Sequence, residues 1–261
     1  MGVIKGIFLV LFSIVLFVSL FSLIFFGILS SSLTYSNVET QAISIIHNFI
    51  DEGMNVTSLV TQNYPFIQEY CKNYSNYVFN AQGYTFDIPC SISLQGQEAI
   101  IEEGIRDLIH QVYYKDYGCQ FLDCFNKSEI PVFLISEQSA NFFSTLFYCS
   151  IGISFILILL CFFLIKKKSN FFILLGIFLI ILSLPFIKIA SLINLLSTKI
   201  TIQFLTIFFS ESSYISILSL LIGIISLVFG LVFGIGFSVF GWFSKFKKEI
   251  PAQKSKKSKS K

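Results

Sequence analysis

The chain has 261 residues, of which 54% are hydrophobic and only 13% are Asp, Glu, Lys or Arg, against about 25% charged residues in a typical soluble domain. So large an apolar fraction excludes an ordinary soluble monomer, because a chain of this length cannot bury that much apolar surface in one core. The net charge is only +3, so the positions of the charges are more informative than their sum.

Long stretches of the chain carry no charge at all. The uncharged stretches are residues 6–38, 138–165, 169–187 and 212–244. A helix that crosses the hydrocarbon core of a bilayer needs about 20 apolar residues, and each stretch reaches or nearly reaches that length. We therefore predict an all-α membrane protein with four transmembrane helices. The predicted spans are residues 6–29, 143–165, 171–191 and 214–241.

The lysines set the expected orientation. Lys5 precedes the first span, three lysines occupy 166–168, and eight follow residue 244, while Glu249 is the only acid in these segments. The loop 30–142 instead holds 13 acidic and four basic residues. Positively charged loops face the cytoplasm, so we expect both termini inside the cell, the loop outside, and the chain in the plasma membrane. The expected cytoplasmic segments are 1–5, 166–170 and 242–261.

The first span is interpreted as an uncleaved signal-anchor helix. The apolar run from Gly6 to Leu29 is 24 residues long, whereas the apolar part of a cleaved signal peptide usually has 7–15 residues. Cleavage near the small residues 30–32 is the alternative.

The loop 30–142 is expected to form a small, mostly helical α+β domain. Its surest helix covers Glu98–Tyr113, with a buried stripe at helical spacing and an ion pair between Glu102 and Arg106. The remaining expected elements are helices at Thr40–Ile50, as an extension of the first span, and Pro65–Tyr70, strands at Tyr84–Ile88 and Val132–Ile135, and a helix cap at Ser136.

Four of the six cysteines lie in this loop, at Cys71, Cys90, Cys119 and Cys124. An even number of cysteines on the oxidising side of a membrane indicates disulfides. Three pairings are open, and we favour Cys71 with Cys90 and Cys119 with Cys124, because both close short loops. Thiol redox catalysis and a zinc site are less favoured, since the spacing is neither C-x-x-C nor a usual zinc-ligand pair.

Other polar features of the loop have ordinary interpretations. Glycosylation sequons occur at Asn55, Asn73 and Asn126, in the loop expected outside the cell. His47 and His110 are expected to be surface or satisfied core residues. The acidic cluster of Glu98, Glu102, Glu103 and Asp107 is interpreted as a solvated helix face, with a loosely held divalent cation as the alternative.

The segment 192–213 is apolar but interrupted by polar residues, so it is expected to lie in the outer membrane interface, with a re-entrant segment as the alternative. Pro185 is expected to end or kink the third span. The fourth span places small residues at steps of three or four, which predicts a close packing face with another helix of this chain or with a second copy. This face comprises Ser216, Ser219, Gly223, Ser226, Gly230, Gly234, Ser238 and Gly241.

The tail 242–261 is rich in lysine and serine and is expected to be disordered, with its lysines near anionic lipid headgroups. No nucleic-acid partner and no cofactor are expected. The cores of the predicted spans lack charged, His, Asn and Gln residues. Transport sites and intramembrane catalytic sites need such residues within the membrane. The sequence therefore favours a non-enzymatic protein whose outer domain binds another protein or assembles an envelope complex. An envelope thiol-disulfide enzyme and an oligomeric small-solute channel are the alternatives.

Overall fold

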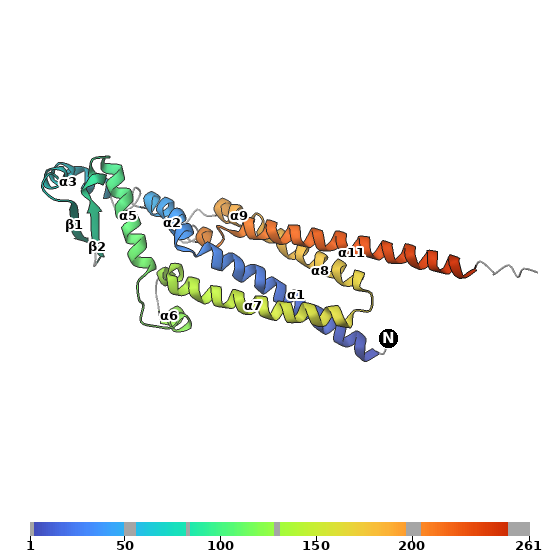
Figure 1. Cartoon of the computed structure of the whole chain (residues 1–261). Helices are drawn as coiled ribbons and strands as arrows, with labels where there is room; N and C mark the ends of the chain where they lie inside the picture. The colour runs from blue at the N-terminus through green and yellow to red at the C-terminus, as the bar shows by residue number, and fades with distance from the viewer. Residues whose placement is uncertain (1–2, 50–55, 82–83, 128–130, 197–204, 250–261) are drawn as a thin grey trace, which may run out of the picture.

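The computed structural model describes residues 3–49, 56–81, 84–127, 131–196 and 205–249. It shows an elongated molecule in which a bundle of long helices carries a group of shorter helices and one β-hairpin at one end (Figure 1). We call this group, residues 33–136, the head. The N-terminus and the far end of the last helix lie at the opposite end of the bundle (Figure 1).

The bundle consists of long apolar helices over the four predicted spans. They are α1 (Val3–Ser32), α7 (Glu137–Leu164), α8 (Lys168–Ser183) followed by η3 (Leu184–Phe186) and α9 (Ile189–Leu196), and α11 (Ser212–Glu249). Four helical stretches are long and apolar enough to cross a membrane, which confirms the prediction of four long apolar helices. Large side chains such as Ile225 and Phe163 stay exposed on the outside of the bundle, at 68% and 75%. An apolar outer surface is what lipid requires of a spanning helix.

Two helix ends follow from local side-chain chemistry. Ser136 caps α7, because its hydroxyl accepts a hydrogen bond from the backbone N–H of Ser139, as expected of an N-terminal cap. At the second helix end, α8 stops at Ser183 and a short 3-10 turn containing Pro185 follows. Proline lacks the N–H that a continuing helix needs, so the expected end of the third apolar helix is confirmed. Whether residues 192–213 lie in the interface or re-enter the membrane stays a prediction, and 197–204 fall outside the described residues.

The bundle is built from two helix pairs, because α1 packs mainly against α7 and α8 mainly against α11. In the first pair the hydroxyls of Ser19 and Ser154 share a buried hydrogen bond of 2.8 Å. Such a bond joins two helices where water is absent. One apolar core runs through the bundle and is formed by Leu16, Leu20, Ile24, Ile28, Leu157, Cys161, Ile165, Phe171, Leu179, Leu182 and Phe186.

The head contains a two-stranded antiparallel sheet surrounded by helices. Its elements are α2 (Tyr35–Phe49), α3 (Val56–Tyr70), β1 (Asn76–Ala81), β2 (Tyr84–Pro89), α4 (Cys90–Ser93), α5 (Gln97–Tyr113), α6 (Phe121–Lys127) and the 3-10 helix η2 (Pro131–Ile135). The expected helix over 98–113 is confirmed by α5, whose buried side includes Ile101, Ile105 and Ile109.

Two of the elements predicted for the head differ in the structure. The predicted extension of the first span is a separate helix, α2, because the side chains of Thr34 and Asn37 both donate to the carbonyl of Ser31, at 3.1 and 2.9 Å. They take the acceptor that a continuing helix would use. The predicted strand at Val132–Ile135 is wrong, because these residues belong to the 3-10 helix η2.

Candidate functional site: the disulfide-closed head

The base of the head shares one apolar core with the neighbouring ends of the bundle. This core unites α2, α5 and η2 with Leu33 after α1 and with Ile207, both fully buried. At its centre the hydroxyl of Tyr113, at the end of α5, donates a 2.9 Å hydrogen bond to the carbonyl of Leu33. Arg106 adds a second link between helices, since it pairs with Glu102 at 2.8 Å and lies 3.6 Å from Glu39 of α2. The head packs onto the bundle through the shared apolar core, to which Ile207 and Phe143 contribute from outside the head.

The burial of Tyr113 has a pH-dependent consequence. Burial is the main cause that raises the pKa of Tyr113 from 10.0 to about 12, so the folded protein resists ionisation that the unfolded chain undergoes near pH 10. The stabilisation linked to this shift is fully present below pH 10 and is lost as the pH rises toward 12. We expect thermal unfolding to show a steeper loss of stability between pH 10 and 12 for the wild type than for Tyr113→Phe.

The matched control for this pH series is Tyr74→Phe. Tyr74 also lies in the head but is 59% exposed, so its removal should leave the pH dependence of the wild type intact. Identical pH profiles for the wild type and Tyr113→Phe would contradict the assignment. Below pH 9, Tyr113→Phe should only cost the single hydrogen bond to Leu33, about 1 kcal/mol.

Beside this base lies a shallow, open hollow of about 390 Å³. It is lined by Tyr84, His110, Gln111, Tyr114 and Lys115. The ring of His110 is exposed and contacts the rings of Tyr35 and Tyr114, at 5.7 and 4.7 Å between centroids. The ammonium of Lys115 lies 5.8 Å from the centroid of the Tyr84 ring. The hollow thus offers aromatic stacking surfaces, and the described residues of its lining include no carboxylate.

The first disulfide ties the helical part of the head to its sheet. Cys71, directly after α3, is bonded to Cys90 at the junction of β2 and α4. The backbone N–H of Cys90 also donates a 2.7 Å hydrogen bond to the carbonyl of Ser75. This bridge joins the edges of a small apolar core formed by Ile67, Ile88 and Ile100.

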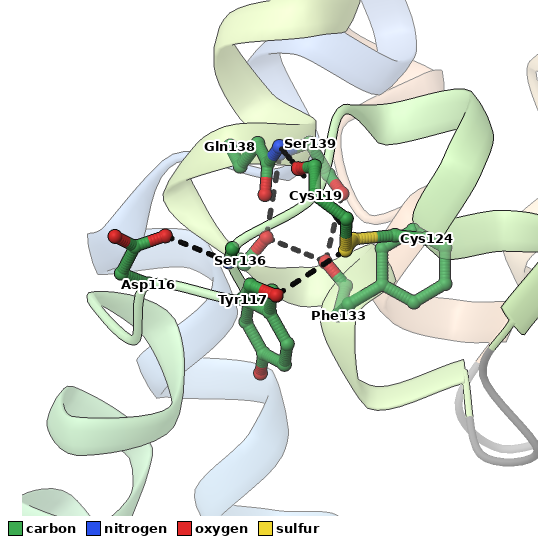
Figure 2. Close-up of a disulfide and its surroundings, with 9 residues drawn as sticks. Asp116, Tyr117, Cys119, Cys124, Phe133, Ser136, Gln138 and Ser139 are labelled. Carbon is green, nitrogen blue, oxygen red and sulfur yellow. Dashed lines mark hydrogen bonds between the residues drawn. A yellow bond between two sulfur atoms is a disulfide. The ribbon is translucent and has the colours of Figure 1, made fainter.

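The second disulfide closes a short loop near the bundle. It joins Cys119 to Cys124, five residues apart (Figure 2). Around it, the side-chain amide of Gln138 donates to the carbonyl of Cys119, and the hydroxyls of Ser136 and Ser139 both donate to the carbonyl of Phe133. The loop that carries this disulfide is therefore fastened to the first turn of α7. Both disulfides have the pairing that we favoured from the sequence, Cys71 with Cys90 and Cys119 with Cys124.

The four acidic residues of the cluster singled out in the sequence all lie on α5, and two of them have partners in the structure. Glu102 pairs with Arg106, and the carboxylate of Asp107 accepts a hydrogen bond from the backbone N–H of Asp87. Within the described ranges, no group of three or more His, Cys, Asp or Glu side chains is placed to hold a metal ion. The side chain of His47 lies outside the described part of the structure.

The three sequons have different positions. Asn73 is exposed in the turn after α3, and Asn126 belongs to α6, while Asn55 falls outside the described residues. Only Asn73 can therefore be placed at the surface of the head. Its use as an acceptor stays a prediction.

The small-residue face of α11 packs against α8 of the same chain. A Cβ atom on Gly223 would lie 3.0 Å from Leu179 Cβ, and one on Gly230 would lie 2.8 Å from the backbone nitrogen of Ile173. The hydroxyl of Ser169 donates to the carbonyl of Gly230 at 2.7 Å, and that of Ser226 donates to a carbonyl of α8 at 3.0 Å.

Other members of this face also lie at the bundle interior. Ser216 and Ser219 are buried, and Gly234 faces Ser169, whereas Ser238 and Gly241 lie on the part of α11 whose side chains are not described. Because α8 already covers the described part of the face, the intrachain arrangement accounts for it. A homo-oligomer through α11 stays a prediction.

Sequence reasoning missed strand β1 and the role of Tyr113. The segment 76–81, Asn-Tyr-Val-Phe-Asn-Ala, does alternate polar and apolar residues in part, which was the available signal. Comparison of the chain with protein-family models, with curated proteins and with solved structures found no match.

Proposed function

We propose that this chain is a four-span membrane protein whose head, held outside the cell, binds another protein and carries out no catalysis itself. The arrangement of charge supports the orientation. Lys5, the lysines of the turn 166–168 and those near the end of α11 belong to the end of the bundle opposite the acidic head (Figure 1). Lysine-rich segments stay in the cytoplasm, so the head is the outer part.

One observation carries the proposed binding role: the covalently closed head exposes large apolar side chains. Leu94, Phe66 and Val78 are exposed by 83%, 62% and 53%. They lie after α4, on α3 and on β1, in the part of the head that the bundle does not reach (Figure 1). Isolated exposed apolar residues are common, but several large ones on one small disulfide-closed domain favour a contact surface for another protein.

Site-specific photocrosslinking in intact cells tests this function. A photoreactive amino acid at Leu94 or at Phe66 is expected to give adducts of defined mass, because a bound partner brings its atoms within reach of these side chains. The adducts are separated by electrophoresis and identified by mass spectrometry.

The matched control is the same photoreactive residue at Thr40, which is exposed on α2 near the bundle. It should give no adduct of the same mass. The absence of adducts from Leu94 and Phe66 alike would refute the proposed binding function. Contacts of the tail lysines with anionic lipids are a separate proposal, and the tail beyond residue 249 lies outside the described residues.

A further inference from the structure

The two outer edges of the head's β-hairpin differ in whether their backbone groups are hydrogen-bonded to other elements. On β2, the backbone N–H of Asp87 donates a 3.0 Å hydrogen bond to the carboxylate of Asp107, and the carbonyl of Thr85 accepts one from the side-chain amide of Gln111. Both acceptor and donor belong to α5. Helix α5 therefore closes the outer edge of β2, which is a usual protection for a strand edge.

The register shows where the corresponding groups of β1 point. Asp87 is opposite Val78 and Thr85 is opposite Asn80. In an antiparallel pair, opposite residues either both bond across the pair or both point away from it, and the two kinds alternate. Since Asp87 and Thr85 point away toward α5, the N–H and C=O groups of Val78 and Asn80 point away from the other edge of the hairpin.

That other edge is open in the described part of the chain. Val78 is 53% exposed, and Figure 1 shows β1 at the outer end of the head, with β2 between it and α5. No backbone hydrogen bond outside the hairpin is formed by Val78 among the described residues. The strand Asn76–Ala81 also contains no proline and no charged residue, although these are common means of blocking an edge.

We propose that the open edge of β1 is a docking site for an extended segment of another protein, which adds to the hairpin as a third strand. Strand addition uses the main-chain groups of Asn76, Val78 and Asn80 for affinity, and side chains at alternate positions for specificity. This inference rests on the proposed binding function and gives its partner a defined chemistry: apolar or aromatic residues alternating with lysine or arginine.

The apolar positions of the partner follow from one face of β1. The rings of Tyr77 and Phe79 point to this face and lie 5.8 Å apart. Tyr77 contacts Tyr70 of α3 at 5.5 Å, and Phe79 stacks on Phe86 of β2 at 4.7 Å. Side chains of an added strand stand directly beside these rings. Apolar or aromatic partner residues on this face therefore gain burial and ring contacts.

The basic positions follow from the other face and from the charge of the head. This face carries Asn76 and Val78 of β1 and the carboxylate of Asp87 on β2, which is exposed. The loop 30–142 has 13 acidic and four basic residues, and Lys72, next to the hairpin, is already paired with Glu69 at 2.5 Å. Lysine or arginine at the alternate positions of the partner matches this charge.

A second copy in the same membrane is a poor occupant. The order of β1, β2 and α5 along the molecule directs the open edge away from the bundle (Figure 1). Two copies anchored in one bilayer hold their edges in the same direction, so the edges do not face each other. The occupant is therefore another protein in front of the membrane.

Hydrogen exchange on the full chain in lipid nanodiscs tests the state of the edge. The amide of Val78 is expected to exchange roughly tenfold faster, or more, than the amides of Tyr77 and Phe79, which bond across the hairpin. The probe is a synthetic octapeptide that alternates lysine with valine or tyrosine. At saturation it should slow exchange at Val78 roughly tenfold or more, whereas a peptide of the same composition with its lysines grouped at one end should not.

Two substitutions separate main-chain pairing from side-chain contact. Val78→Pro removes an N–H that has no partner in the hairpin, so the protein should still form the Cys71–Cys90 disulfide while peptide binding, measured by fluorescence anisotropy, is lost. Val78→Ile keeps both the N–H and the exposed branched apolar side chain, so it should retain peptide binding and serves as the conservative control for Val78→Pro.

The contrary results are distinct. Slow exchange at Val78 in the free protein, the same peptide affinity for Val78→Pro as for the wild type, or no protection by the octapeptide would each overturn the docking edge. Protection that grows with protein concentration alone would assign the edge to a second copy and would also overturn it. If photocrosslinks from Leu94 persist unchanged in Val78→Pro, the docking edge is wrong but the binding function stands.

Discussion

Replacing Gly176 with leucine is expected to separate α8 from α11 and to give the largest loss of stability of any single substitution in the bundle. A Cβ atom at Gly176 would lie 2.7 Å from the carbonyl oxygen of Gly223 and 2.7 Å from the backbone nitrogen of Leu227. Both contacts are with backbone atoms, which cannot rotate away, so the helices themselves must move. The loss should exceed the roughly 1–3 kcal/mol of ordinary overpacking.

The measurement is thermal unfolding of the detergent-solubilised protein, followed by size-exclusion chromatography. Gly152→Leu is the matched control, because a Cβ atom at Gly152 on α7 meets no atom within 4 Å. The control should unfold within a few degrees of the wild type. Equal unfolding temperatures for Gly176→Leu and Gly152→Leu would refute the close α8–α11 contact.

Removing the Cys71–Cys90 disulfide is expected to destabilise the head by about 3 kcal/mol, the value for a bridge that closes a loop of about 20 residues. The double substitution to alanine avoids leaving an unpaired thiol. Amide exchange in α3 and in the hairpin should accelerate, while exchange in α7 stays as in the wild type. Cys149→Ala is the control, because Cys149 is a free cysteine on α7.

The same cysteines distinguish a structural head from a thiol-disulfide enzyme. In intact cells, a membrane-impermeant maleimide should label the four head cysteines only after reduction. Labelling of Cys119 or Cys124 without reductant would support the enzymatic alternative, since catalytic thiols have to be accessible.

The long helices were predictable because lipid imposes a strict rule on them. A chain in hydrocarbon has to satisfy its backbone internally and exclude charge, so the uncharged stretches alone located α1, α7, α8 and α11. The helix α5 was equally clear from the spacing of Ile101, Ile105 and Ile109. In these cases the burial pattern is decided within one element.

The elements that the sequence predicted wrongly, or did not predict, depend on contacts with other parts of the chain. A short apolar run such as Val132–Ile135 suits a strand or a helical turn equally, and the hydroxyls of Ser136 and Ser139 bond the carbonyl of Phe133 to favour the turn. Strand β1 exists because β2 pairs with it, which residues 76–81 alone do not reveal. Short β elements depend on their context in this way.

The small-residue face on α11 was predictable as a face but not in its partner. Glycines and serines at steps of three or four mark a close approach of helices. They do not specify which helix approaches. The choice of α8 depends on Gly176, which faces Gly223 of α11, and on Ser169, which bonds the carbonyl of Gly230.

The great length of α11 has a consequence for the surrounding lipid. The helix has 38 residues and, at about 1.5 Å per residue, measures about 57 Å, nearly twice the roughly 30 Å thickness of a hydrocarbon core. Helix α8 beside it has only 16 residues. The uncharged part of α11 alone is longer than the hydrocarbon core is thick. Either α11 tilts or the bilayer thickens locally around it, and the protein should partition into thicker membranes.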